Sequence, residues 1–557
     1  MLHTSLKLKI ATLILFISCH FSLNAKDYYV HPTLGNDANS GMSINDSFKT
    51  LSHLNNIKFL PGDRIFLASN QTYEGSINLK NQQGTKEKPI TINTISWNST
   101  NAIIPAIINF KGAPNGILIE DSSFINISNL QLTANGYYNN DEKVSKMRCG
   151  ILITNKLSKQ MSNITINKVS IFDVYYENEG FTRGKGEVKT ANGTQKYGWG
   201  IRVINSNPKA LIEDVYIENS HIKSVSHTGI KLTGKKYNIT NVFISDNKVE
   251  ATGGPGIQMS GVKNVTVKNN TVTHSGSTDD TRKWGRGSGL WTWSASHILI
   301  EKNKFLYANG PGDSAGAHID FNCDNVVLQY NLSAYNAGGF CEILGNNYNC
   351  AYRYNISIND GHRVKGVNGA FQEGKIFWLS GYQGTNKKRK GPVNSYFYNN
   401  TIYSDSTIVS KIAIDNTSKG ILIANNIFYL KGASKAVLGD QYRPDKSSDK
   451  GVENVFFKNN LFLNQKNWPK EIGIHDSNPI YGDPLFLNAG GIELQDYFPR
   501  NKSLVENKGI EITFLPGDTE GLLQDFKLNK DILGNTIKNK PTLGAILYKE
   551  KYYRQNK

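Results

Sequence analysis

A short phrase built around asparagine recurs along the chain and constrains the fold more than any other feature. Each copy has apolar residues at alternate positions, then two polar residues, an asparagine and a further apolar residue, as in VFISDNKV, VTVKNNTV and ILIEKNKF. A repeat of this length, made of strand-sized pieces joined by turns, predicts a solenoid of stacked β-coils. The recurring asparagines are Asn247, Asn270, Asn303, Asn331, Asn355, Asn400, Asn426 and Asn460.

Asparagine suits a repeated turn because it tolerates left-handed backbone and because its amide both donates and accepts hydrogen bonds. Stacked one per coil, the amides can bond to the turns above and below and satisfy buried backbone groups. We therefore interpret these asparagines as a structural ladder rather than as glycosylation sites.

A second recurring phrase has small or apolar residues around one position that varies widely. Its copies are GIRVI, GIKLTG, GIQMSG, GLWTW, AHIDF, FCEIL and FWLSG, between Gly200 and Gly381. If each copy is a strand, alternate side chains face opposite sides, so an apolar column points inward and the variable column points outward. The predicted outward column is Arg202, Lys231, Gln258, Trp291, Asp320, Glu342 and Trp378.

Together the two phrases resemble the right-handed parallel β-helix proteins of the pectate-lyase-like superfamily, which include exported bacterial polysaccharide-degrading enzymes. The opening YYV…GNDANSG…FKTL…PGDRI also resembles the N-terminal cap of such proteins. The resemblance implies an all-β solenoid with three strands per coil, an asparagine ladder after the second strand and a short helical N-terminal cap. It further implies that a polysaccharide binds on the outer face of the first sheet, although the ladder itself is silent on chemistry.

The ends of the chain predict its segments and its destination. Lys7 and Lys9 precede a short apolar run, and Ala25 is a suitable last residue before cleavage, so residues 1–25 are predicted to be a signal peptide. We expect a secreted or periplasmic protein without a transmembrane segment, with lipid anchoring at Cys19 as the less favoured alternative. We assign 26–110 to the N-terminal cap and first coils, 111–500 to the β-helix that carries the active groove, and 501–557 to a C-terminal cap or tail.

A basic charge balance favours an anionic partner. The formal net charge is +17, and removal of Lys7 and Lys9 with the signal leaves +15. The basic residues are scattered rather than clustered, which argues against nucleic acid. We expect a sulfated or uronate-containing polysaccharide as the partner of a monomeric protein.

Two acids in the outward column, Asp320 and Glu342, are the predicted catalytic pair. If they stand at equivalent positions on consecutive coils, their carboxyl groups lie about 5 Å apart. Repulsion at that distance raises one pKa and leaves one acid protonated and the other ionised, as glycoside hydrolysis requires. The short separation suits a retaining mechanism, whereas an inverting one would need a wider pair that includes Glu373 or Asp313.

Other residues of the column and of three long loops, at about 174–199, 275–288 and 359–374, are predicted to bind substrate. Trp291 and Trp293 could form a platform for sugar faces, and His318 shares the face of Asp320. Arg202 and Lys231 suit carboxylate or sulfate groups. The predicted substrate-binding residues are Arg202, Lys231, Gln258, Trp291, Trp293, His318, Trp378, Arg363 and Glu373.

Two alternatives to hydrolysis remain open. In a polysaccharide lyase Lys231 would remove a proton next to a uronate carboxylate, and Asp320 with Glu342 would hold Ca²⁺. Hydrolysis is preferred because Lys231 and Asp320 are about 15 Å apart along the stack, too far for one reacting carbon. The hydrolase needs no cofactor. A glycan-binding β-helix without catalysis is the second alternative.

Overall fold

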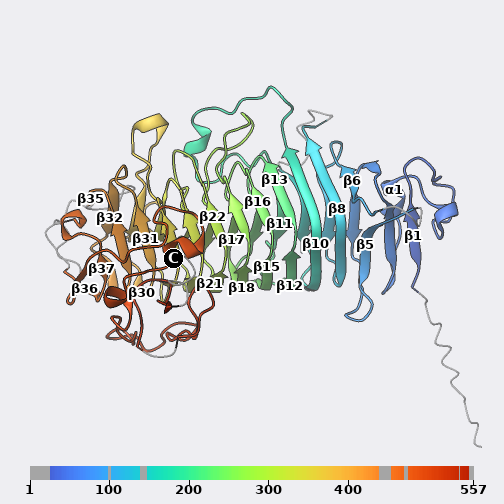
Figure 1. The fold of residues 1–557 in the computed structure, drawn as a ribbon. Helices are drawn as coiled ribbons and strands as arrows, with labels where there is room; N and C mark the ends of the chain where they lie inside the picture. The colour runs from blue at the N-terminus through green and yellow to red at the C-terminus, as the bar shows by residue number, and fades with distance from the viewer. Residues whose placement is uncertain are drawn as a thin grey trace, which may run out of the picture.

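The computed structural model describes residues 25–97, 102–137, 147–437, 453–469, 475–537 and 540–550, and these residues form one long stack of β-coils (Figure 1). Nearly all of the predicted signal peptide, Cys19 included, lies outside the described residues. Among the helices of the described part, none is both long and apolar enough to cross a membrane.

Three columns of parallel strands run along the stack. The first column is a separate sheet in which each strand pairs with its equivalent on the neighbouring coil. Its strands are β4 (Ile77–Lys80), β7 (Asn115–Glu120), β9 (Met147–Thr154), β11 (Tyr197–Ile204), β14 (Ile230–Thr233), β17 (Ile257–Ser260), β20 (Leu290–Trp293), β23 (Ala317–Ile319), β26 (Gly339–Ile343), β29 (Lys375–Leu379), β32 (Ser410–Ile414) and β35 (Ser434–Ala436).

The second and third columns follow the first in each coil and share two long strands. The second column comprises β1 (Asp27–Val30), β2 (Arg64–Ala68), β5 (Ile90–Ile95), β8 (Ile125–Asn135), β10 (Gln160–Tyr175), β12 (Leu211–Glu218), β15 (Ile239–Ser245), β18 (Val262–Lys268), β21 (Ser296–Glu301), β24 (Asp324–Gln329), β27 (Ala351–Arg353), β30 (Val393–Tyr398), β33 (Lys419–Ala424) and β36 (Glu453–Lys458). The third comprises β3 (Thr72–Glu74), β6 (Ala106–Asn109), the second halves of β8 and β10, β13 (His221–Val225), β16 (Lys248–Glu250), β19 (Thr271–Thr273), β22 (Lys304–Leu306), β25 (Leu332–Ala334), β28 (Ile356–Ile358), β31 (Thr401–Ser404), β34 (Ile427–Leu430), β37 (Leu461–Phe462) and β38 (Ile480–Tyr481). The predicted parallel β-helix with three strands per coil is confirmed.

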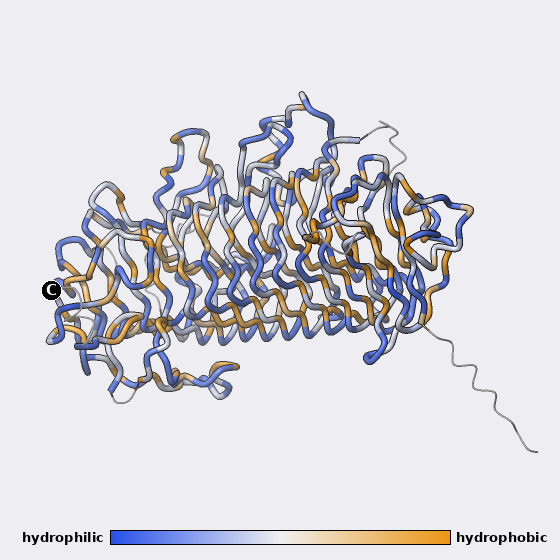
Figure 2. Tube along the Cα trace, turned by 45° about the vertical axis from the view of Figure 1, so that its right-hand side comes forward, coloured by the Kyte–Doolittle hydropathy of each residue, from blue (hydrophilic) through white to orange (hydrophobic). Residues whose placement is uncertain are grey.

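Apolar side chains fill the interior of the stack. Ile201, Ile230, Ile257 and Leu290 pair on successive coils and are fully buried. Burial of each such side chain stabilises the fold by roughly 1.5–3 kcal/mol. Figure 2 shows hydrophobic and hydrophilic residues alternating along the coils, as the inward and outward columns require.

The asparagine ladder is confirmed at all eight predicted positions. In a typical rung, Asn303 Nδ2 donates to Val267 O at 2.9 Å and to Asn331 Oδ1 at 3.0 Å. The first rung, Asn247, accepts from the Ser220 N–H at 2.9 Å. The last rung, Asn460, donates to Asp476 Oδ2 at 2.7 Å, so a carboxylate ends the series.

The left-handed residue of each ladder turn differs from the prediction. It is the residue before the ladder asparagine, with φ of 57° at Asp246, 55° at Asn269 and 56° at Lys302. Lys302 shows that the position is not reserved for asparagine. The ladder asparagine is selected for the hydrogen bonds of its amide and not for its backbone conformation.

Short segments cover the ends and one flank of the stack. The helix α1 (Leu51–Leu54) buries Leu51 and Leu54 at the N-terminal end, which confirms the helical cap. The helix α2 (Lys502–Val505) begins the C-terminal segment. This segment continues back along the ladder turns, where Tyr398 Oη donates to Phe526 O at 2.8 Å and Asn425 Nδ2 donates to Ile510 O at 2.8 Å. The predicted cap or tail therefore packs along the flank of the solenoid.

Candidate functional site

The outer face of the first sheet carries the predicted column, and the strand register sets its order. Arg202 stands opposite Lys231, and Gln258 and Trp291 follow on the next two coils. On the coil after that, His318 and not Asp320 stands opposite Trp291. Because Ile319 pairs with Ile343, the next residue in the column is Glu342, followed by Trp378.

The prediction that Asp320 and Glu342 occupy equivalent positions is therefore wrong. Asp320 lies two residues beyond the column, beside Trp293 on the preceding coil. A shift of two residues preserves the alternation of inward and outward side chains, so the pattern could not reveal the slip. The glycines just before each first-sheet strand could have revealed the register. A Cβ on Gly289 would lie 2.4 Å from Gly316 O, so these two glycines stand at the same point of adjacent coils.

Asp320 nevertheless lies close to other acids. Burial raises the pKa of Asp320 to about 7, and the carboxyl groups of Glu342 and Asp313 act in the same direction. His318 and a hydrogen bond of 2.8 Å from the Phe321 N–H oppose this rise. Asp320 can therefore carry a proton near neutral pH, as a general acid must.

Asp313 is a buried acid that stays ionised. It lies in the segment between β22 and β23, where Arg286 Nε donates to Oδ2 at 2.8 Å and Arg286 Nη2 donates to Oδ1 at 3.0 Å. Burial acts to raise the pKa of Asp313, but the Arg286 guanidinium outweighs burial and holds the pKa below its usual value. Asp313 and Asp320 thus have pKa values that are moved apart by their surroundings.

His318 is a buried residue of the column. Its Nδ1 lies 3.0 Å from Ser288 Oγ, and its ring meets Trp291 edge to face with centroids 5.5 Å apart. Burial lowers the pKa of His318, although the charges of Asp320 and Asp313 act in the opposite direction. A neutral imidazole beside Asp320 can donate to or accept from a hydroxyl group.

Most of the predicted column is covered rather than open to solvent. Arg202, Lys231, Gln258, Trp291, Glu342 and Trp378 are each buried, with at most 9% of their surface exposed. Trp293 is 41% exposed, and Asp320 is partly exposed. Trp293 and Asp320 are therefore more open to solvent than the residues of the column.

An aromatic surface lies beside Asp320, but it is not the predicted one. Trp291 packs against His318, whereas Trp293 faces Phe321 with ring centroids 5.7 Å apart. Phe321 in turn lies 5.9 Å from Tyr382. Of these three rings Trp293 is exposed and the other two are half-buried, and such rings can stack on sugar faces. Phe321 is the last residue of the phrase AHIDF and Tyr382 directly follows the phrase FWLSG, but neither occupies the variable position of its phrase, so both were missed.

Two other predicted substrate-binding residues brace the loops. Arg363 donates to the backbone oxygens of Gln372, Gly310 and Asp313 at 2.8–3.0 Å, and so fixes the segment that carries Asp313. Glu373 pairs with Lys411 at 3.0 Å. Trp378 is covered by Lys375, whose Nζ lies 3.7 Å from the ring centroid. Contact of these residues with substrate stays a prediction.

At the other end of the column Arg202 and Lys231 lie against Trp199. Arg202 Cζ is 4.1 Å and Lys231 Nζ is 5.0 Å from the Trp199 ring. Burial, and to a smaller extent the charge of Arg202, lower the pKa of Lys231 from 10.5 to about 7. Burial also lowers the pKa of Arg202.

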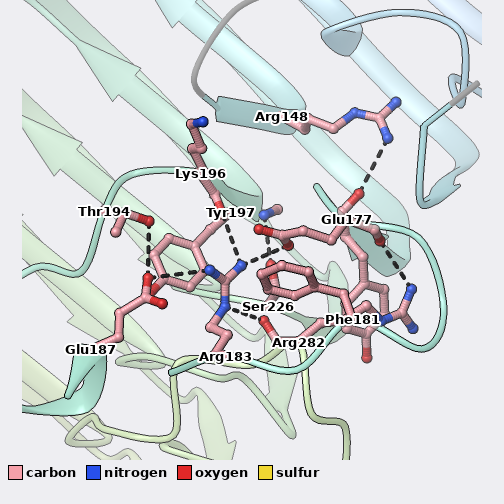
Figure 3. Close-up of polar contacts among 12 residues, drawn as sticks. Arg148, Glu177, Phe181, Arg183, Glu187, Thr194, Lys196, Tyr197, Ser226 and Arg282 are labelled. Atoms are coloured by element: carbon pink, nitrogen blue, oxygen red, sulfur yellow. Dashed lines mark hydrogen bonds and ion pairs between the residues drawn. The ribbon is translucent and has the colours of Figure 1, made fainter. Parts of the chain in front are cut away.

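The loop between β10 and β11 is held in place by a buried charge network (Figure 3). Arg183 Nη2 donates to Glu177 Oε2 at 2.7 Å, and Arg183 Nη1 donates to Glu187 Oε1 at 3.2 Å. Arg183 Nε also donates to Arg282 O at 2.6 Å, which ties this loop to the one between β19 and β20. These long loops rise on one side of the stack (Figure 1).

The described residues contain no group of three or more His, Cys, Asp or Glu side chains arranged to hold a metal ion. The four described cysteines, Cys149, Cys323, Cys341 and Cys350, are buried and unpaired with one another.

Comparison with known proteins supports the fold. The family model of the right-handed β-helix region matches residues 199–368. Lacto-N-biosidase of Bifidobacterium longum subsp. longum is 24% identical over 626 residues, which cover 93% of this chain but only 36% of that protein. The crystal structure of the GH136 lacto-N-biosidase from Eubacterium ramulus has a TM-score of 0.51 and 18% identity, over 74% of this chain and 67% of that chain. The chain thus resembles right-handed parallel β-helix enzymes that degrade glycans.

Proposed function

We propose that this protein is an exported enzyme that hydrolyses glycosidic bonds of an anionic polysaccharide, sulfated or uronate-containing. The observation that carries the proposal is Asp320, a carboxyl group with a pKa of about 7 beside two other carboxyl groups and an exposed aromatic surface. Hydrolysis of a glycoside needs one protonated and one ionised carboxyl group on either side of the bond.

In this proposal Asp320 is the general acid. It gives its proton to the leaving oxygen as the bond from that oxygen to the sugar carbon breaks. Glu342 is the predicted second carboxylate, which attacks that carbon or removes a proton from the attacking water. Asp313 is the candidate for the same role if the pair is wider, because Arg286 keeps it ionised. Trp293 would stack on a sugar ring, and His318 would bind a hydroxyl group.

The relative from Bifidobacterium longum supports hydrolysis, because its name is that of a glycosidase. The chain spans only about a third of that protein. The substrate of the relative is therefore only one of several glycans to be tested as a substrate of this chain. A lacto-N-bioside is neutral, whereas the charge of this chain and the cations Arg202 and Lys231 favour an acidic glycan. We further propose a secreted or periplasmic monomer, without a metal cofactor.

The test is a panel of a nitrophenyl lacto-N-bioside, uronate polysaccharides and sulfated polysaccharides. We expect the wild-type protein to release new reducing ends from at least one of them. Asp320→Asn should lower kcat by about 10²–10⁴-fold on natural glycans, and less on an aryl glycoside whose leaving group needs no proton. Glu74→Gln, an exposed acid far from the column, serves as the control.

The second carboxylate is identified by rescue. Glu342→Gln and Asp313→Asn are each assayed with added azide, a small anion that can replace a missing nucleophile or base. Recovery of activity in one variant, with formation of the glycosyl azide, assigns the role to that residue. Binding of a glycan without any cleavage by the wild-type protein would instead support a non-catalytic binding protein.

One observation favours a lyase as a second candidate. Lys231 has a pKa near 7 and stands next to Arg202, so a neutral amine and a cation for a uronate carboxylate lie together. In that reaction Lys231 takes the proton next to the carboxylate, a carbon–carbon double bond forms, and the glycosidic oxygen leaves. Ultraviolet absorbance of the unsaturated product that is lost in Lys231→Met but kept in Asp320→Asn would overturn hydrolysis. If the lyase reaction needs calcium, added chelator should abolish this absorbance.

A further inference from the structure

Arg202 and Lys231 are two buried cations on adjacent coils without an acidic partner among the described residues. Each side chain keeps only 6% of its surface exposed. Arg202 donates to Met147 Sδ at 2.8 Å, and its Nε has no hydrogen-bond partner. Oε1 of Gln258, on the next coil, is also buried without a partner.

This arrangement lacks a negative charge. Equivalent positions on neighbouring coils are about 4.8 Å apart, so the two cations repel each other. A buried charge without a counter-charge costs several kcal/mol. Arg148 and Arg353 offset that cost with hydrogen bonds to backbone and side-chain oxygens, and other cations offset it with carboxylates. Arg183 pairs with Glu177 and Glu187, and Arg286 pairs with Asp313.

The groups packed around the two cations do not supply the missing charge. Trp199 lies beside both head groups, and it is stacked on His227 with centroids 4.0 Å apart. Burial lowers the pKa of His227 far below its usual value and raises the pKa of Cys149 to about 12, so both are neutral at pH 7. The aromatic face orients the cations but leaves the positive charge uncompensated.

We propose that Arg202 and Lys231 form a subsite for a single carboxylate or sulfate group of the bound glycan, with Gln258 Oε1 accepting a hydrogen bond from a hydroxyl group of the same sugar. The proposal rests on the proposed function and deepens it. Lys231 is three coils from His318 in the column, which is about 14 Å. The subsite therefore binds the charged group of a sugar that lies well away from the glycosidic bond on which Asp320 acts.

A proton accompanies the anion into this subsite. A bound anion stabilises charged Lys231, whose pKa without ligand is about 7. Above pH 7 the free lysine is largely neutral and must take up a proton to bind, so affinity for the anion falls as pH rises beyond 7. Arg202 stays charged throughout this range and provides the part of the affinity that does not change with pH.

The direct test uses inorganic sulfate and glucuronate as probes, with glucose as the neutral control. Melting temperatures of the full chain are measured for wild type, Arg202→Met, Lys231→Met and the double variant. Lys223→Met is the matched control, because its side chain is 55% exposed on β13. We expect both anions to raise the melting temperature of wild type and control more than that of the double variant. Equal shifts in all proteins would overturn the subsite, since sulfate also stabilises proteins without binding.

The second arm separates the subsite from the catalytic proposal. For matched neutral and acidic glycans that wild type cleaves, the double variant should lose about 10–100-fold in kcat/KM on the acidic glycan only. Equal loss on both glycans, or no loss, would overturn the subsite and leave hydrolysis in place. Anion-dependent stabilisation without cleavage of any glycan would keep the subsite and overturn the hydrolase.

Discussion

Burial acts on Asp320 and Lys231 in opposite directions and brings both groups to a pKa of about 7. Removal from water disfavours the charged form, so the pKa of an acid rises and that of a base falls. Each residue can therefore exchange a proton near neutral pH, about 14 Å apart along the same sheet. In our proposal the proton of Asp320 is used in bond cleavage, and the proton of Lys231 is used in binding an anion.

The pKa of Asp320 predicts how activity depends on pH. Below pH 7 Asp320 is protonated and can act as the acid, and above pH 7 it loses its proton, so kcat should fall with an apparent pKa near 7. The measurement is a pH profile of kcat on a natural glycan and on an aryl glycoside. The alkaline fall should be weaker for the aryl glycoside. An identical fall for both substrates would contradict the role of Asp320 as acid.

Lys231 predicts a gain in stability at the expense of function. Its pKa is lowered from 10.5 to about 7, so between these values the unfolded chain binds more protons than the folded one. Lys231 therefore destabilises the fold below pH 7, and this effect disappears as pH rises to 10.5. Lys231→Met should raise the free energy of unfolding by about 1 kcal/mol or more at pH 7 and by little at pH 10.5. Denaturant unfolding at both pH values tests this, with Lys223→Met as the unaffected control.

The sequence predicted the face on which the column residues lie better than it predicted their exposure. The sequence placed Arg202, Lys231, Gln258 and Trp291 correctly in one outward column, because strand alternation is a local property. It could not show that these side chains are covered, because the long loops are held by contacts between residues far apart in the sequence, such as Arg183 and Arg282, which are 99 residues apart. The Arg286–Asp313 pair, 27 residues apart, was hidden because both residues lie in loops that no repeat contains.

At the scale of elements, the two recurring phrases differ in what they could reveal. The ladder asparagine is one amide per coil with fixed partners, so its position identified the turn between the second and third strands without ambiguity. The first-strand phrase alternates with a period of two, so it fixed the face but not the register. That is why Asp320 was placed beside Glu342 in the column when His318 occupies the position.

Asn303 provides a test of the ladder. Asn303→Ala removes the acceptor shared by the Asn270 N–H and the Asn270 Nδ2, and leaves these buried donors without that partner; it also removes the side-chain donor to Val267 O. We expect a loss of about 2–4 kcal/mol in the free energy of unfolding, since each unsatisfied group costs about 1–3 kcal/mol. Asn93→Ala, which breaks only the partly exposed bond from Asn129 Nδ2, should cost less than about 1 kcal/mol. Similar losses in both variants would mean that the ladder adds no more than a surface amide pair.

For the whole molecule, the sequence predicted the solenoid but not how its flank is covered. The stack follows from patterns repeated every few tens of residues, whereas the C-terminal segment has no repeat. It packs on Tyr354, in the turn after β27, and on Tyr396 and Tyr398 of β30. The C-terminal segment thus depends on a surface that exists only after the coils have stacked.

Removal of residues 509–557 should expose this surface. Leu515 and the aromatic side chains around it are buried together, so the shortened chain should bind a hydrophobic dye, melt at a lower temperature and associate with itself. Dye fluorescence and light scattering test this, with a chain shortened only by residues 551–557 as control. A shortened chain with an unchanged melting temperature would show that the segment does not support the stack.

The bonds of the C-terminal segment span long stretches of sequence. Asn349 contacts Asp518 across 169 residues, Arg353 contacts Asp525 across 172, and Asn399 contacts Thr542 across 143. Strands within the stack, by contrast, meet only the coils next to them. If the two ends of the molecule were pulled apart, the C-terminal coils could not separate from the stack until these contacts of the C-terminal segment had broken. Among the described residues, the coils near β1 have no such long-range contacts and can unfold one at a time. We therefore expect mechanical unfolding in small steps from the N-terminal end and in one large step from the C-terminal end.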